Sequence, residues 1–88
     1  MSEPYTLVMM PSALETKLKP SAAFALFEFM GSALCDAPHR VGKPLATTFE
    51  GYLSARRGAY RVIYRVDDKT HSVKVMTIDH RTDVYRPR

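Results

Sequence analysis

The residues best suited to chemistry are cations, a histidine and a tyrosine in the second half of the chain. They are Arg56, Arg57, Arg61, His80, Arg81 and Tyr85. Guanidinium groups present forked donors that match phosphate oxygens and stay charged at any working pH, which suits a phosphorane-like transition state. Proton transfer needs another group, and His80 is the nearby side chain that normally titrates near neutrality.

Two residues of this set also have structural interpretations. His80 can be a strand-end histidine bonded to Asp79 or Asp83. Tyr85 can donate a proton if its pKa is lowered, stack on a nucleobase, or dock the tail on the domain. The sequence has no acyl-transfer, zinc-protease or phosphate-loop motif and no clustered carboxylate pair. We therefore expect no metal and no cofactor, which leaves metal-free phosphodiester cleavage by the RNA 2′-OH, or binding without chemistry.

A strand over residues 59–66 is expected to position the arginines. Alternation places Tyr60, Val62, Tyr64 and Val66 on one face and Arg61 and Arg65 on the other. Residues 67–70 have turn chemistry, and residues 71–80 are rich in β-branched side chains, so a hairpin closing at positions 68 and 69 is predicted.

The strand register decides which side chains share a face. If Val66 pairs with His71, then Ile63 faces Lys74, Arg61 faces Met76 and Arg57 faces His80. The predicted basic face comprises Arg57, Arg61, Arg65, Lys74 and His80, beside exposed Ile63, Met76 and Ile78. Tyr60, Val62, Tyr64, Val66, Val73 and Val75 would form the opposite, apolar face.

The first half of the chain predicts a strand and two helices. Residues 5–10 form the strand, and Ser12 and Glu15 have the spacing of a capping box for a short helix that ends before Pro20. A second helix over residues 21–35 carries an apolar stripe, and we expect ordinary packing for its members and for Cys35. The stripe comprises Ala23, Leu26, Phe27, Met30 and Leu34, widened by Phe24 and Phe29.

A basic loop over residues 40–44 then offers Lys43 as a contact, and a strand over residues 52–56 leads through Gly58 into the central strand. His39 and His71 are interpreted as surface residues. The predicted order is β-α-α-β-β-β, an α+β fold with an antiparallel sheet and both helices on one face. The opposite face would be solvated and would carry the arginines.

Composition fits one domain spanning residues 1–88. The 88 residues, 45% hydrophobic, can bury a core without disulfides, and the single cysteine favours a reducing cytoplasm. No segment is long and apolar enough for a membrane span, and no signal peptide is evident. Residues 1–50 hold 4 Lys/Arg against 5 Asp/Glu, and residues 51–88 hold 9 against 4, so the charge changes from −1 to +5. A polyanionic partner is expected, although solubility alone also explains such charge.

Three segments together resemble the RelE branch of the RelE/ParE toxin superfamily. They are residues 40–45 (RVGKPL), residues 54–68 (SARRGAYRVIYRVDD) and residues 78–86 (IDHRTDVYR). The resemblance covers nearly the whole chain and implies a RelE-like, microbial-RNase-like fold. It also implies a bacterial toxin that cleaves mRNA in the ribosomal A site, depends on the ribosome, and is neutralised by a cognate, DNA-binding antitoxin.

The resemblance also assigns roles to residues. Arg61 and Arg81 look like the family's phosphate-stabilising groups, Tyr85 like its C-terminal catalytic tyrosine, and Arg56 like a substrate-contacting arginine. His80 is similar to a histidine beside the tail tyrosine of related toxins. Arg57 and Arg65 are expected to join Arg56 and Lys43 in contacting RNA.

One feature departs from the family pattern. Some relatives carry a Lys-x-Lys pair where this chain has Tyr52 and Ser54. His80 is the natural replacement as general base, with Lys43 as an electrostatic helper. The ParE branch, whose toxins poison DNA gyrase on the same fold without this arginine–tyrosine set, is the alternative.

Overall fold

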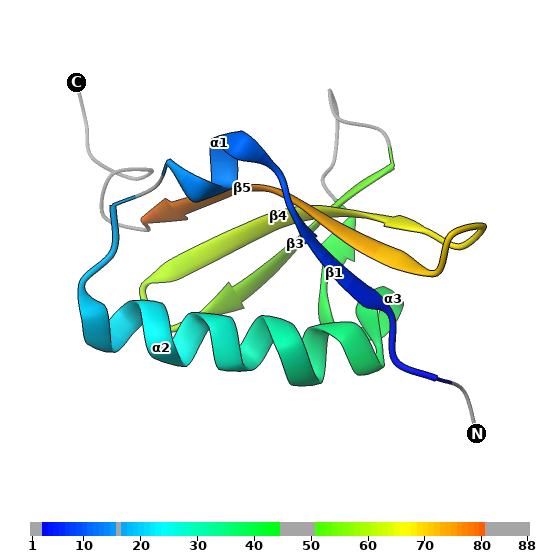
Figure 1. The fold of residues 1–88 in the computed structure, drawn as a ribbon, viewed down its shortest axis with the longest axis horizontal. Coiled ribbons are helices and arrows are strands. Elements are labelled where there is room, and N and C mark those ends of the chain that lie inside the picture. Colours follow the sequence, from blue (N-terminus) through cyan, green and yellow to red (C-terminus); the bar gives the residue numbers. More distant parts are fainter. Residues whose placement is uncertain (1–2, 16, 45–50, 81–88) are drawn as a thin grey trace.

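A computed structural model describes residues 3–15, 17–44 and 51–80. Five strands form one sheet in the order β1-β5-β4-β3-β2, and the long helix lies across one side of it (Figure 1). The strands are β1 (Thr6–Met9), β2 (Lys43–Pro44), β3 (Tyr52–Arg57), β4 (Tyr60–Asp67) and β5 (Ser72–His80). The helices are α1 (Pro11–Leu14), α2 (Pro20–Phe29), the π-helical turn η1 (Met30–Leu34) and α3 (Pro38–Val41).

The predicted α+β class is confirmed, but the sheet is mixed rather than antiparallel. β1 runs parallel to β5, with Leu7 opposite Val73, while the other strand pairs are antiparallel. The alternation of apolar residues marks a strand without giving its direction, and β1 reaches β5 only after all the helices and three strands. The sequence pattern therefore could not separate the two arrangements.

The core lies between α2–η1 and the sheet. Leu26, Met30 and Leu34 are fully buried and belong to one cluster with sheet residues such as Val62 and Tyr64. Cys35 is buried, as predicted. Within the described part of the chain, no helix has the length and apolar character that a membrane span requires.

The prediction that the buried stripe includes Phe27 and is widened by Phe24 is wrong. Phe24 is 72% exposed and Phe27 is 44% exposed. The helical period of 3.6 residues turns Phe24 to the side opposite Leu26, and Phe27 about a quarter turn away from it. The three- and four-residue spacing had assigned Phe27 to the core, and hydrophobic type alone had assigned Phe24.

The predicted capping box is also wrong. α1 has Met10 at its N-cap, and no side chain caps it. The Ser12 hydroxyl instead donates to the backbone carbonyl of Met76, which ties α1 to β5. α2 begins at Pro20, one residue before the predicted start, because proline is well accepted in the first turn of a helix.

The hairpin register differs from the predicted one by two residues near the turn. Asp67 pairs with Ser72 and Val66 with Val73, so the loop between the paired residues has four residues. His71 adopts a left-handed φ of 56°, and the Asp67 carboxylate accepts bonds from the backbone N–H groups of Lys69 and Thr70. These contacts close a wider turn than the tight one predicted from positions 68 and 69.

A β-bulge between Ile63 and Tyr64 shifts the register once more. Arg61 consequently pairs with Asp79 rather than Met76, and Tyr60 pairs with His80. Beyond the bulge the register differs from the predicted one by three residues, an odd number. Every β5 residue there therefore lies on the face opposite to the predicted one. Ile78 is therefore a core residue with 3% exposure, and Ile63 is only 8% exposed, so the predicted exposed apolar set is wrong.

Candidate functional site

The sheet face opposite α2 carries a concentration of cations, and we call it the open face. Residues that lie directly opposite each other on neighbouring strands share a face of the sheet. The pairs that define the open face are Lys43–Ser54, Ser54–Ile63, Tyr52–Arg65, Arg56–Arg61, Arg61–Asp79 and Arg65–Lys74. The open face thus holds Lys43, Arg56, Arg61, Arg65 and Lys74 against the carboxylates of Asp67 and Asp79. This confirms the predicted placement of Arg61, Arg65 and Lys74. Such an excess of positive charge attracts an anionic ligand.

Arg61 is the most enclosed cation of the open face. Its side chain is 28% exposed, and its guanidinium lies 3.8 Å from the Asp79 carboxylate, at the limit of an ion pair. Its Nε is buried without a hydrogen-bond partner among the described residues. Because buried donors are normally satisfied, this Nε and the loosely held guanidinium can bind an anion.

A hollow of about 410 Å³ lies beside Arg56. It is lined by Val41, Lys43, Pro44, Ser54 and Arg56. Lys43 pairs with Ser54 across β2 and β3, while Arg56 pairs with Arg61 across β3 and β4. The hollow is therefore bordered by cations from adjacent strands, an arrangement suited to a phosphate.

The segment carrying Lys43 was predicted to be a loop, but it forms α3 and β2. The buried Tyr64 hydroxyl donates to the Pro38 carbonyl oxygen at 2.6 Å, and burial raises the pKa of Tyr64 to about 12. The hydroxyl therefore stays protonated at physiological pH and remains a donor. Gly42 is buried directly against the Tyr64 ring. These contacts hold α3 against the sheet and so position Lys43 at the hollow.

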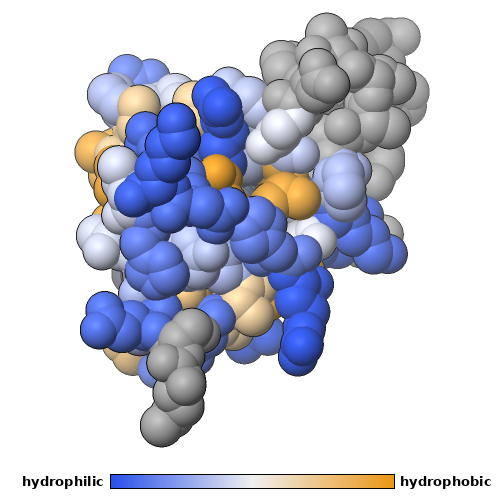
Figure 2. Space-filling model, turned by 90° about the vertical axis from the view of Figure 1, so that its right-hand side faces the viewer, coloured by the Kyte–Doolittle hydropathy of each residue, from blue (hydrophilic) through white to orange (hydrophobic). Residues whose placement is uncertain are grey.

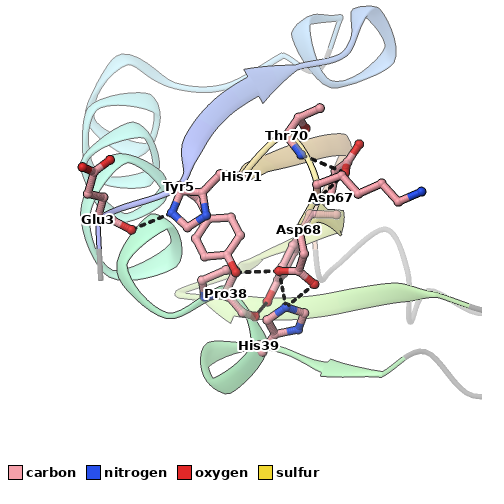
Figure 3. Close-up of polar contacts among 10 residues, drawn as sticks. Glu3, Tyr5, Pro38, His39, Asp67, Asp68, Thr70 and His71 are labelled. Carbon is pink, nitrogen blue, oxygen red and sulfur yellow. Dashed lines mark hydrogen bonds and ion pairs between the residues drawn. The ribbon is translucent and has the colours of Figure 1, made fainter. Parts of the chain in front are cut away.

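A second set of contacts, the Asp68 clasp, joins three distant segments (Figure 3). The Asp68 carboxylate accepts a bond from the Tyr5 hydroxyl at 2.6 Å and lies 3.2 Å from His39 Nε2 in α3. The Tyr5 ring stacks on His71 with centroids 3.8 Å apart, and His71 Nε2 contacts the Glu3 carbonyl oxygen at 2.7 Å. The clasp links the N-terminal segment, α3 and the β4–β5 turn.

The clasp lies at the end of the molecule that bears the β4–β5 turn. Figure 2 faces this end, and hydrophilic residues cover most of it. His39 and His71 had been interpreted as surface residues. His39 is indeed exposed, but both histidines take part in defined contacts. No local pattern in the sequence indicates these contacts, because Tyr5 and Asp68 are 63 residues apart.

The clasp predicts a specific dependence of stability on pH. The Tyr5 hydroxyl, followed by His39, holds the pKa of Asp68 below the ordinary value of 3.8. A lowered pKa in the folded state stabilises the domain above the unfolded pKa, and this contribution disappears as pH falls through the folded value. Urea unfolding followed from pH 6 downward should therefore show a shallower loss of stability below about pH 4 in Asp68→Asn.

Tyr5→Phe is the companion variant, because it removes the largest cause of the shift and leaves the carboxylate in place. Tyr5→Phe should therefore make the loss of stability below about pH 4 shallower than in the wild type, but by less than Asp68→Asn does. Unfolding curves of Asp68→Asn that keep the wild-type pH dependence would contradict the assignment of this loss to the clasp.

Two predicted members of the basic face lie elsewhere. Arg57 pairs with Tyr60, and Tyr60 with His80, which puts Arg57 and His80 on the helix-side face of the sheet. The Arg57 guanidinium lies 5.7 Å from the centroid of the Phe29 ring. The His80 ring meets Tyr60 edge-on, with centroids 4.8 Å apart. The alternation along β3 and the bulge between β4 and β5 cause this difference from the predicted face.

The remaining predicted site residues, Arg81 and Tyr85, lie outside the described residues. Sequence reasoning missed Asp79 as a neighbour of Arg61, because the predicted register placed Met76 there. Among the described residues, no group of three or more His, Cys, Asp or Glu side chains could hold a metal ion. The arrangement that the structure does bring together is Lys43, Arg56, Arg61 and Asp79.

Three comparisons identify similar proteins. A family model described as the ParE toxin of the type II toxin–antitoxin system parDE matches residues 17–85. The toxin RelG of Mycobacterium tuberculosis is 44% identical over 85 residues, covering 94% of this chain and 98% of that toxin. The toxin RelE of the same organism is 46% identical over 70 residues, covering 80% of this chain and 72% of that toxin.

The fold comparison agrees with the sequence comparisons. The crystal structure of the toxin–antitoxin complex RelBE2 from Mycobacterium tuberculosis contains a chain that superimposes with a TM-score of 0.86 at 42% identity. The match covers 90% of the present chain and 100% of the other. Both kinds of comparison thus extend over the elements that build the open face.

Proposed function

Because the chain belongs to the RelE branch of the RelE/ParE superfamily, the toxins of type II toxin–antitoxin systems, we propose that it cleaves messenger RNA in the ribosomal A site. The observation that carries the proposal is the open face, where Arg61 has a buried donor without a partner among the described residues, next to the hollow of Lys43 and Arg56. The toxin would act in the bacterial cytoplasm and arrest growth by stopping translation.

In the proposed reaction, the RNA 2′-oxygen attacks the adjacent phosphorus. The bond from phosphorus to the 5′-oxygen of the next nucleotide breaks, which leaves a cyclic phosphate and a 5′-hydroxyl. Arg61 stabilises the charge that develops on the phosphoryl oxygens, assisted by Arg56 and Lys43. Arg81 and Tyr85 act as phosphate stabiliser and as proton donor to the leaving oxygen.

The structure favours a different proton acceptor from the one predicted. His80 lies on the helix-side face beside Tyr60, whereas Asp79 lies on the open face 3.8 Å from the Arg61 guanidinium. A carboxylate at this place can take the proton of the 2′-OH while the arginine contacts the phosphate. We therefore assign the acceptor role to Asp79 in place of His80.

If Asp79 is the proton acceptor, two substitutions that each remove a proton-accepting group should have unequal effects. Asp79→Asn should lower the cleavage rate by about 10²- to 10⁴-fold, because general bases typically contribute that much. His80→Gln should retain the rate within about tenfold. The measurement is single-turnover cleavage of mRNA on programmed ribosomes, with folding checked by circular dichroism. The reverse order of the two effects would return the acceptor role to His80.

A cognate antitoxin is the proposed protein partner. The similar chain in the RelBE2 structure is part of a toxin–antitoxin complex. An antitoxin segment with acidic side chains would complement the five cations of the open face and exclude RNA from it. Its association should therefore slow with added salt and with Arg61→Glu or Arg65→Glu. A rate indifferent to both would place the docking surface elsewhere.

The family model supports one alternative, because its description names the toxins of parDE systems. A ParE-like toxin would bind DNA gyrase rather than cut RNA. The experiment that separates the two combines the purified protein with a reconstituted translation reaction and, in parallel, with a gyrase supercoiling reaction. We expect mRNA cleavage with supercoiling unchanged, and the opposite pair of results would favour the alternative.

A further inference from the structure

We propose that Arg65, held over the Tyr52 ring, is a stacking platform for a base of single-stranded RNA. The inference rests on the proposed function, since it requires RNA on the open face. It adds a contact of another chemical kind, because the groups assigned so far recognise phosphate or move protons. The platform would bind one nucleobase of the strand whose phosphate lies at Arg61.

The geometry that carries the inference is the pairing of β3 with β4. Tyr52 lies directly opposite Arg65, and the Arg65 guanidinium is 5.4 Å from the centroid of the Tyr52 ring. Arg65 is exposed and Tyr52 is half-buried. An aromatic ring that supports one side of a guanidinium restrains it, and its planar outer side is a surface on which bases stack.

The platform is in line with the proposed phosphate site. Along β3 and β4, the pair Ser54–Ile63 separates the Tyr52–Arg65 pair from the Arg56–Arg61 pair. The two outer pairs are therefore four residues apart on one face, a distance of roughly 13 Å at the usual rise of a strand. The hollow is lined by Ser54 of the middle pair, by Arg56, and by Lys43 on the neighbouring strand β2. An RNA chain that leaves Arg61 and follows the direction of β3 would pass Lys43 and reach Arg65.

Charge alone does not distinguish Arg65 from its neighbour, so Lys74 is the matched control. Lys74 pairs with Arg65 across β4 and β5 and lies 3.6 Å from the Asp67 carboxylate. It contributes a cation at the same end of the open face but offers no planar group. If Arg65 acts only through its charge, removing Lys74 should have effects of the same kind.

The test separates base recognition from phosphate recognition. Two short single-stranded RNA oligomers of equal length are used, one with bases and one abasic, both with 2′-O-methyl groups that prevent cleavage. Affinity is measured at low salt for the wild type, Arg65→Lys, Tyr52→Leu and the control Lys74→Ala. Circular dichroism reports folding, and Arg65→Lys alone decides the result if Tyr52→Leu fails to fold.

We expect Arg65→Lys and Tyr52→Leu to weaken binding of the base-bearing strand by about tenfold, within the range found for stacking of a base on a side chain. Binding of the abasic strand should change less than about twofold, because the charge is kept. Lys74→Ala should weaken both strands equally. The platform would be overturned if Arg65→Lys lowered the affinity for both strands equally, or for neither. It would also be overturned if the wild type did not prefer the base-bearing strand.

Cleavage of translated mRNA, measured separately, keeps this result distinct from the proposed function. If base-dependent binding is absent and cleavage persists, the platform is wrong and the proposed function stands. If base-dependent binding is present and the wild type does not cleave, the platform stands and the proposed function is wrong.

Discussion

Arg61→Ala should lower the rate of mRNA cleavage by at least about a hundredfold while the domain remains folded. Removing one donor that stabilises a developing oxyanion typically costs this much or more. The side chain lies on the open face, outside the core cluster between α2–η1 and the sheet, and it has a donor that no described residue satisfies. Single-turnover cleavage on programmed ribosomes and thermal unfolding would be measured on the same preparation.

Arg57→Ala is the matched control for this prediction. It removes an arginine from the adjacent residue pair, but from the helix-side face, where the guanidinium lies over Phe29. We expect a loss of about 0.5–1 kcal/mol of stability from this cation–π contact and cleavage within about threefold of the wild type. Equal losses of activity in the two variants would show that the face assignment does not govern function.

Gly42→Ala should destabilise the domain and impair cleavage together. A Cβ at this buried position would overlap the Tyr64 hydroxyl and come within 2.9 Å of the Tyr64 Cζ. The ring is itself fully buried, so it cannot move aside without disturbing the core or breaking its bond to the Pro38 carbonyl. Overpacking of this kind costs about 1–3 kcal/mol. Because Lys43 is the next residue, we also expect weaker RNA contact at the hollow.

Gly31→Ala provides the control of equal chemical size. A Cβ at Gly31 would meet nothing within 4 Å, and the residue lies in a helical turn, where alanine is preferred to glycine by about 0.5–1 kcal/mol. Chemical unfolding should therefore show stability unchanged or raised in Gly31→Ala and lowered in Gly42→Ala. A Gly42→Ala domain as stable as the wild type would mean that α3 is not fixed by Tyr64.

The sequence predicted much of the fold because its strongest signals are local. The two-residue alternation of Arg61 and Arg65 against Val62 and Tyr64 placed the cations and the core on opposite faces of β4, as observed. The glycine at position 58 marked the β3–β4 turn, where its φ is 63°. Such features depend on a few neighbouring residues, and the chain alone specifies them.

The errors concern contacts that are not local. A bulge at Ile63 and Tyr64 adds one residue to one strand, and no periodic pattern reveals it, yet it moves His80 off the open face and brings Asp79 to Arg61. The Asp68 clasp is another example, since its partners are distant in sequence and are brought together only by the folded sheet. The resemblance to relatives assigned roles by position, but only the register showed which side chains share a face.

The measurement that tests the proposed function most directly is the mapping of mRNA ends in a reconstituted translation reaction. Ribosomes are positioned on a defined codon, the purified protein is added, and primer extension locates any new ends, with naked mRNA and the Arg61→Ala protein as controls. The proposal predicts new ends within the A-site codon, formed by the wild type only and only when ribosomes are present. Intact messages, or the same ends with Arg61→Ala, would contradict the claim that the open face cleaves mRNA on the ribosome.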